Sequence, residues 1–169
     1  LLRLGQLGRR APPVDDVPGI VRDWQISKSF PGDAVDLEKA PEAQPLGDLG
    51  WTPLSSEPSG LVDISRVRRR AQPADVVFAR TRITSDRDEI RKFDIGYSDL
   101  VTVLVNGTPV FSGNSQYQGR DSSFLGIAGW FDSVFLPLRQ GANELTLVVA
   151  EVSGGWGFKV RDGRAVFGA

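Results

Sequence analysis

DLVTVLVNGTPVF at residues 99–111 decides the fold, because it reads as two short strands joined by a tight turn. A two-residue hairpin turn of the favoured type needs positive φ at both central positions, and Asn106-Gly107 adopts that conformation readily. Every second residue before the turn is a valine, so the valines share one face of a strand. Pro109 cannot donate a hydrogen bond to a neighbouring strand, which predicts that its strand lies at a sheet edge or leaves that position unpaired. The stretch therefore predicts a β-hairpin with one apolar face.

Further strands are expected on both sides of this hairpin. Apolar residues alternate with other residues in most of them, whereas residues 145–152 are apolar on both faces, as in a central strand. No stretch has the spacing of an amphipathic helix. The chain is therefore expected to be all-β and antiparallel, with additional strands near residues 24–27, 61–64, 76–85, 92–97, 131–136 and 156–160.

The chain divides into a flanking segment and one domain. Residues 1–22 carry several Gly and Pro residues without a sustained period, which indicates a linker or the tail of a preceding module. The domain is expected to span residues 23–169. Within it, residues 31–60 hold five of the eleven prolines, and we expect a long surface excursion with little regular structure there.

Composition excludes several classes of function. The formal net charge of −1 gives no overall field toward nucleic acid or an anionic membrane, and the basic run RVRRR at 66–70 is expected to be a solvated loop. Without His or Cys, the chain alone cannot form a Ser-His-Asp triad, a Cys-His pair, a thiolate or imidazole zinc site or a disulfide. Carboxylate chemistry and the binding of hard cations by oxygen ligands stay open.

Three segments together resemble the galactose-binding-domain-like jelly rolls, including the non-catalytic sugar-binding sandwich of family 2 glycoside hydrolases and carbohydrate-binding modules. They are FARTRI at 78–83, VTVLVNGTPVF at 101–111 and LPLRQGANELTLVV at 136–149, and the resemblance extends over roughly residues 24–162. These motifs specify the fold better than the function, because Asn-Gly hairpins and similar loops serve sandwich geometry. The resemblance implies an antiparallel jelly-roll β-sandwich of about eight strands that binds rather than reacts. Domains of this group commonly bind glycans or act as spacers, and some hold a structural calcium ion.

A glycan site needs an apolar face for sugar C–H groups and planar polar groups that form bidentate hydrogen bonds with hydroxyls. Long loops on rigid sandwiches are where binding usually resides, and the loop at 112–130 supplies both kinds of side chain. The alternative is that its aromatic residues cap the core while its Arg and Asp form a structural ion pair. The candidate ligand-binding residues are Asn114, Gln116, Tyr117, Arg120, Asp121 and Trp130.

Other candidate residues have simpler explanations. Trp156 shares a strand face with Phe158 and Val160, so we expect it to be buried, whereas Trp51 is expected to be exposed or to anchor the excursion. Five carboxylates could supply oxygen ligands to calcium, although they lack EF-hand spacing and a solvated acidic surface is the alternative: Asp33, Asp36, Glu38, Asp48 and Asp63.

We therefore expect a non-catalytic carbohydrate-binding-like module of a larger exported protein. Asp121 with Asp132 is the strongest pair for catalysis by carboxylates, but nothing in the sequence places the two at a glycosidase separation. The expected partners are a glycan and adjacent domains of the parent protein, without nucleic acid or membrane, in an extracellular, periplasmic or cell-surface location. The alternative is a structural or protein-interaction β-sandwich with no glycan ligand.

Overall fold

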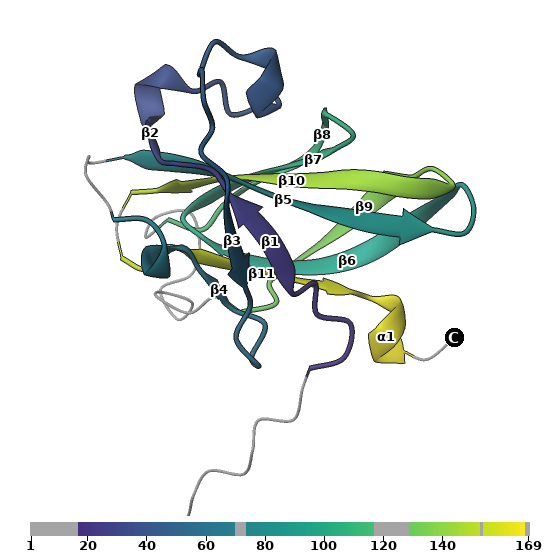
Figure 1. The fold of residues 1–169 in the computed structure, drawn as a ribbon. Helices are drawn as coiled ribbons and strands as arrows, with labels where there is room; N and C mark the ends of the chain where they lie inside the picture. The colour runs from purple at the N-terminus through teal and green to yellow at the C-terminus, as the bar shows by residue number, and fades with distance from the viewer. Residues whose placement is uncertain (1–16, 70–73, 117–128, 153, 168–169) are drawn as a thin grey trace, which may run out of the picture.

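The computed structural model describes residues 17–69, 74–116, 129–152 and 154–167. These residues form two antiparallel sheets stacked face to face (Figure 1), which confirms the expected all-β sandwich. The described residues contain eleven strands rather than about eight. The strands that were not expected are two short ones, at Phe30–Pro31 and Thr52–Ser55. No helix in these ranges is long and apolar enough to cross a membrane.

One sheet has seven strands, and β5 and β10 lie at its centre. Their register pairs Gly141 with Ser85 at one end and Glu151 with Asp75 at the other, so the two strands run together over eleven residues each. In order across the sheet the strands are β3 (Thr52–Ser55), β1 (Asp23–Ile26), β5 (Asp75–Ser85), β10 (Gly141–Glu151), β7 (Leu100–Val105) and β8 (Thr108–Asn114), and β2 (Phe30–Pro31) also pairs with β5.

The second sheet has four strands. Its order is β4 (Val62–Asp63), β11 (Gly157–Asp162), β6 (Glu89–Ser98) and β9 (Asp132–Leu138). The remaining elements are single turns, namely the 3₁₀ helices η1 (Gly32–Ala34), η2 (Pro41–Ala43) and η3 (Ile64–Arg66) and the four-residue helix α1 (Arg164–Phe167).

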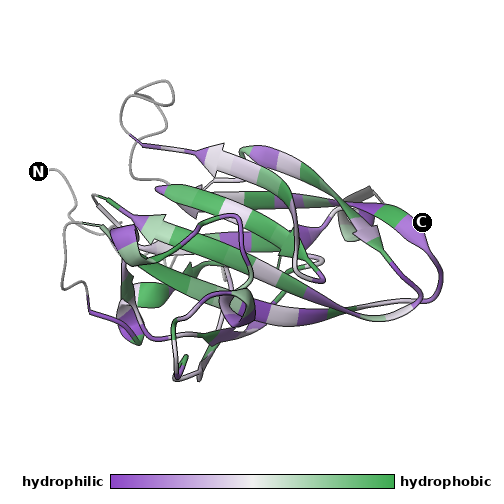
Figure 2. Ribbon diagram, turned by 90° about the horizontal axis from the view of Figure 1, so that it is seen from above, coloured by the Kyte–Doolittle hydropathy of each residue, from purple (hydrophilic) through white to green (hydrophobic). Residues whose placement is uncertain are grey.

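The main core lies between the two sheets and comes from the alternation within each strand. Trp24 of the larger sheet packs edge-to-face against Phe158 of the smaller one, with ring centroids 4.7 Å apart. Trp156 is buried in the same core, as expected from its strand face. Figure 2 shows that the hydrophobic residues lie mainly along the strands, while the connecting segments are mostly hydrophilic or neutral. Burial of these apolar faces is the main force that holds the sheets together.

The Asn-Gly hairpin has the predicted geometry. Asn106 and Gly107 both have positive φ, 50° and 82°, and they join β7 to β8. β8 is the edge strand of the larger sheet, and Pro109 is exposed there. The pairing shifts by one residue between Val103 and Leu104, which is a β-bulge next to Pro109.

The excursion at residues 31–60 is more ordered than expected. It contains β3, which pairs with β1 over four residues, and the 3₁₀ helices η1 and η2. Its first part covers one half of the outer face of the seven-stranded sheet (Figure 1). That contact forms a second hydrophobic cluster, made of Phe30, Val35, Val76, Phe78, Leu104, Val148 and Ala150, against which Leu37, Leu46, Leu49 and Trp51 also pack.

One arginine of the basic run has a structural role that the sequence did not indicate. Arg66 and Arg69 are exposed, as expected of a solvated loop, and residue 70 lies outside the described ranges. Arg68 instead donates hydrogen bonds to the backbone carbonyls of Ile26, Ser27, Val67 and Gly50 and to Thr52 Oγ1, at 2.6–3.0 Å. Burial lowers the pKa of its guanidinium. Arg68 therefore ties β1 to the end of the excursion.

Candidate functional site

The predicted glycan loop is described only at its two ends. Tyr117, Arg120 and Asp121 lie outside the residues that the structure describes. Asn114 is exposed at the end of β8, and its Oδ1 accepts a hydrogen bond of 2.9 Å from the Gln116 backbone N–H. This contact is an Asx turn, which gives the side chain of Asn114 a local structural role.

Trp130, the remaining predicted residue, is partly buried beside the four-stranded sheet. The guanidinium carbon of Arg161 lies 4.5 Å from the centroid of its ring, and Lys159 Nζ lies 5.7 Å away. Arg161 is held in place by Asp94, whose Oδ2 accepts from its Nε at 3.0 Å. Trp130 is therefore packed in a cation–π contact rather than presented as an open platform.

Three of the five carboxylates proposed for calcium serve local turns. Asp36 Oδ1 accepts from the Glu38 backbone N–H, Asp48 from that of Gly50, and Asp63 from that of Ser65. Among the residues that the structure describes, no group of three or more His, Cys, Asp or Glu side chains could hold a metal ion. Asp132 accepts a hydrogen bond of 2.8 Å from the Tyr97 hydroxyl.

A hollow lies elsewhere, on the outer face of the seven-stranded sheet. It is an open groove of about 720 Å³, in the half of that face that the excursion leaves uncovered. A volume in this range suits a small ligand. The groove is lined by Asp23, Trp24, Gln25, Pro53, Arg80, Thr81, Arg82, Asn106, Ala142, Asn143 and Glu144. None of these residues belongs to the predicted loop.

Sheet register places the polar groups of the groove in two adjacent rows. One row runs from Gln25 on β1 to Arg80 on β5 and Thr146 on β10. In the second row, Arg82 on β5 pairs with Glu144 on β10, and Asp23 of β1, two residues before Gln25, lines the same groove. We call Asp23, Arg82 and Glu144 the charged row. Because neighbouring strands lie about 4.8 Å apart, side chains of one row can contact the same ligand.

Arg80 is fixed at the boundary between the open and the covered half. Its Nε donates to Gln25 Oε1 at 2.9 Å, and its Nη1 lies 3.5 Å from Glu42 Oε1. Its guanidinium carbon lies 3.9 Å from the centroid of the Trp51 ring. These three contacts hold the guanidinium in one orientation.

The charged row, in contrast, has uncommitted polar atoms. Arg82 is exposed and forms no hydrogen bond or ion pair with the residues that the structure describes. Glu144 is exposed as well, and its Oε1 is only 3.4 Å from the Thr146 hydroxyl. Asp23 accepts one hydrogen bond from Ser55 Oγ at 2.8 Å. These side chains can donate to or accept from a ligand without breaking structural contacts.

The end of the groove is rigid. Asn106 of the hairpin turn donates from Nδ2 to Asn143 Oδ1, and its Oδ1 accepts from the Glu144 backbone N–H, both at 2.9 Å. Asn143 is buried and bonds to the Arg139 and Gly141 carbonyls. The Asn106 amide thus has a structural role, and it fixes the backbone that carries Glu144.

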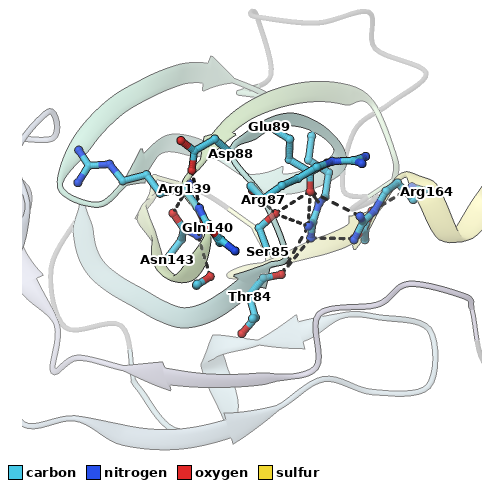
Figure 3. A network of polar contacts seen from close by, with 12 residues as sticks. Thr84, Ser85, Arg87, Asp88, Glu89, Arg139, Gln140, Asn143 and Arg164 are labelled. Carbon is cyan, nitrogen blue, oxygen red and sulfur yellow. Dashed lines mark hydrogen bonds and ion pairs between the residues drawn. The ribbon is translucent and has the colours of Figure 1, made fainter.

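A separate polar network closes the same end of the sandwich (Figure 3). Glu89 Oε1 accepts from Arg91 Nε at 2.9 Å and from the Ser85 hydroxyl at 2.8 Å, and Arg164 of α1 lies 3.5 Å from it. The hydrogen bonds from Arg91 and Ser85 lower the pKa of Glu89 from 4.5 to about 2. Each of these groups contacts Glu89, so the network stabilises the β5–β6 turn and α1 rather than forming a ligand site.

Comparisons with known proteins support the fold. The chain matches neither a protein-family model nor a curated protein sequence. It is structurally similar to the selenomethionine-labelled β-glucosidase from Kluyveromyces marxianus, with a TM-score of 0.51 and 11% identity, over 83% of this chain and 16% of that chain. This likeness shows a shared β-sandwich fold.

Two further solved structures match less well. The K. marxianus β-glucosidase in complex with glucose has a TM-score of 0.47 at 14% identity, over 83% of this chain and 16% of that chain. The PA14 domain of the MpAFP antifreeze protein has a TM-score of 0.44 at 8% identity, over 84% of this chain and 81% of the domain. The chain thus spans about a sixth of the glucosidase length.

Proposed function

We propose that this chain is a non-catalytic carbohydrate-binding module and that its glycan lies in the groove on the seven-stranded sheet. The observation that carries the proposal is the charged row, in which exposed carboxylate and guanidinium groups stand side by side on a rigid sheet. Sugar hydroxyls each donate and accept, and planar carboxylate and guanidinium groups can bind two neighbouring hydroxyls at once.

The structural setting supports this proposal in two ways. The groove is built on strands rather than on loops, so its polar groups are positioned before a ligand arrives, which reduces the entropy lost on binding. Arg80 is held by Gln25, Glu42 and Trp51, so its unused donors face a defined direction. The Arg80 guanidinium occupies one face of the Trp51 ring, so that face is not open to a sugar. Glycan binding would therefore rely mainly on polar contacts.

The sequence resemblance to galactose-binding-domain-like jelly rolls also supports glycan binding in the groove. FARTRI at 78–83, one of the segments that carries the resemblance, contains both arginines of the groove. A module of this kind would act beside other domains of an exported or cell-surface protein, where glycans are abundant. That location and those neighbouring domains belong to the proposal.

A glycan array followed by titration calorimetry tests the proposal. The wild type is compared with Arg82→Ala, and Arg66→Ala is the matched control because Arg66 is also exposed but lies outside the groove. We expect Arg82→Ala to weaken binding at least tenfold and Arg66→Ala to leave it unchanged. A third variant, Trp130→Ala, tests the loop at 112–130. Loss of binding in Trp130→Ala alone would move the site to that loop, and no binding to any glycan would overturn the proposal.

A second candidate function is a protein-interaction module. The outer face of the four-stranded sheet exposes two large apolar side chains, Ile90 at 73% and Phe135 at 61%. Pro137 is exposed as well and pairs with Ile90 across β6 and β9. Exposed apolar groups gathered in this way are typical of contact surfaces. Hydrogen exchange of β9 in the intact parent protein tests this function, since a contact there would slow exchange relative to the separate module.

A further inference from the structure

We infer that the groove selects an uncharged oligosaccharide and rejects acidic glycans such as uronates and sulfated sugars. This inference deepens the proposed function and rests on it. Its basis is the arrangement of charges in the groove, which would repel a ligand anion from Arg82, the groove arginine that has no partner among the described residues.

The charges of the groove balance one another. The lining includes two arginines, Arg80 and Arg82, and two carboxylates, Asp23 and Glu144. Arg80 also lies 3.5 Å from Glu42, a residue outside the lining whose side chain is 53% exposed. Its positive charge is therefore already partly compensated by that carboxylate. The groove has no excess of positive charge with which to attract an anion.

Arg82 is the cation of the lining that forms no ion pair with the described residues, and its strand lies between the strands of two acids. Glu144 is its direct register partner on β10, and Asp23 lies on β1, the strand on the other side of β5, and lines the same groove. Adjacent strands are separated by about 4.8 Å. An anion bound to Arg82 would therefore lie close to both carboxylates, and like charges at such distances disfavour binding.

An uncharged sugar meets no such repulsion. One hydroxyl can donate to a carboxylate of the charged row while its neighbour accepts from the Arg82 guanidinium, so acceptors and donors alternate along the row. From β1 to β10 the charged row crosses two strand spacings, about 10 Å. That length accommodates a short oligosaccharide lying across the strands rather than a single sugar.

Titration calorimetry at low ionic strength with five defined probes tests the inference. The neutral probes are cellotetraose, xylotetraose and mannotetraose, and the acidic probes are tetragalacturonate and a sulfated heparin tetrasaccharide. We expect at least one neutral probe to bind the wild type at least ten times more tightly than either acidic probe. We also expect the double variant Asp23→Asn with Glu144→Gln to bind tetragalacturonate at least ten times more tightly than the wild type does.

The controls distinguish charge selection by the groove from glycan binding itself. Glu38→Gln removes an exposed carboxylate outside the groove and should not improve binding of tetragalacturonate. If an acidic probe binds the wild type as tightly as the best neutral probe, or if the double variant gains no affinity for tetragalacturonate, the charge selection is wrong while glycan binding stands. If no probe binds and the array is also negative, the proposed function fails and this inference fails with it.

Discussion

The guanidinium of Arg80 lies over the indole ring of Trp51, with 3.9 Å between the guanidinium carbon and the ring centroid. This contact joins β5, in the middle of the seven-stranded sheet, to the excursion that covers half of its outer face. Arg80 thus belongs both to the groove and to the packing of the excursion.

Arg80→Ala should lower the free energy of unfolding by about 1–2 kcal/mol, because it removes a cation–π contact and the charge-assisted hydrogen bond to Gln25. Urea denaturation monitored by tryptophan fluorescence measures the change. Arg82→Ala is the matched control, and we expect it to change stability by less than about 0.5 kcal/mol, as is usual for exposed side chains. Equal effects of the two substitutions would contradict the structural role of Arg80.

Arg68→Ala should destabilise the protein more strongly, by about 2–4 kcal/mol, since it leaves the carbonyls of Ile26, Ser27 and Gly50 without their charged donor. Lys at this position cannot reproduce the planar set of donors, so Arg68→Lys should restore only a small part of the loss. Thermal and urea unfolding measure both variants. Arg66→Ala, at the first position of the same basic run, should leave the stability unchanged. A comparable loss of stability in that variant would show that the contacts of Arg68 are unimportant.

Glu89 should contribute to stability in a pH-dependent way. Its pKa is about 2 in the folded protein against 4.5 for the free side chain, so the ionised form is favoured by folding. The contribution is complete above about pH 4.5 and is lost as the pH falls toward 2. Melting temperatures of the wild type and Glu89→Gln should therefore differ at neutral pH and converge across that interval.

The matched control for this titration is Glu38→Gln, which removes one negative charge at an exposed position far from Arg91 in the sequence. A difference between wild type and Glu89→Gln that stayed constant down to pH 2 would argue against the ion pair with Arg91 as the source of the lowered pKa.

Gly113→Ala should be strongly destabilising, by about 1–3 kcal/mol, because overpacking of a closed site forces its neighbours to move. A Cβ at this position would lie 1.9 Å from the Tyr97 hydroxyl oxygen, which donates to Asp132. Gly141→Ala is a useful comparison, since nothing lies within 4 Å of a Cβ there and its cost comes only from a φ of 95°. Calorimetric unfolding should show the larger loss of stability in Gly113→Ala. NMR resonances around Tyr97 should broaden in that variant only.

Much of the fold could be predicted from sequence because it depends on local patterns. The alternation around Val103, the positive φ at Asn106 and Gly107, and the burial of Trp156 follow from residues within one strand or turn. β3 was not predicted, since Pro53 and a length of four residues hide its alternation. β3 lies at the edge of the sheet, where Pro is tolerated because one side of the strand is unpaired.

The groove could not be predicted in the same way. Alternation did place Arg80 and Arg82 on one face of a strand, but their chemistry depends on Asp23 and Glu144, which are brought beside them only by the pairing of three strands. The role of Arg68 was hidden for a related reason, since its partners are backbone carbonyls around residues 26 and 50, which carry no sequence signature. The predicted site at Asn114, Gln116 and Trp130 stays a prediction.

The outer face of the seven-stranded sheet changes character halfway along its strands. On β5 the outward residues Val76 and Phe78 lie under the excursion, while Arg80 and Arg82 face the groove. The tolerance to substitution should differ between the covered half and the open half of this face. Substitutions in the covered half disturb packing and endanger folding, whereas those at Arg82 or Glu144 leave the core untouched. A lineage carrying this domain could therefore change the chemistry of the groove by altering a few exposed positions, without first acquiring compensating changes elsewhere in the molecule.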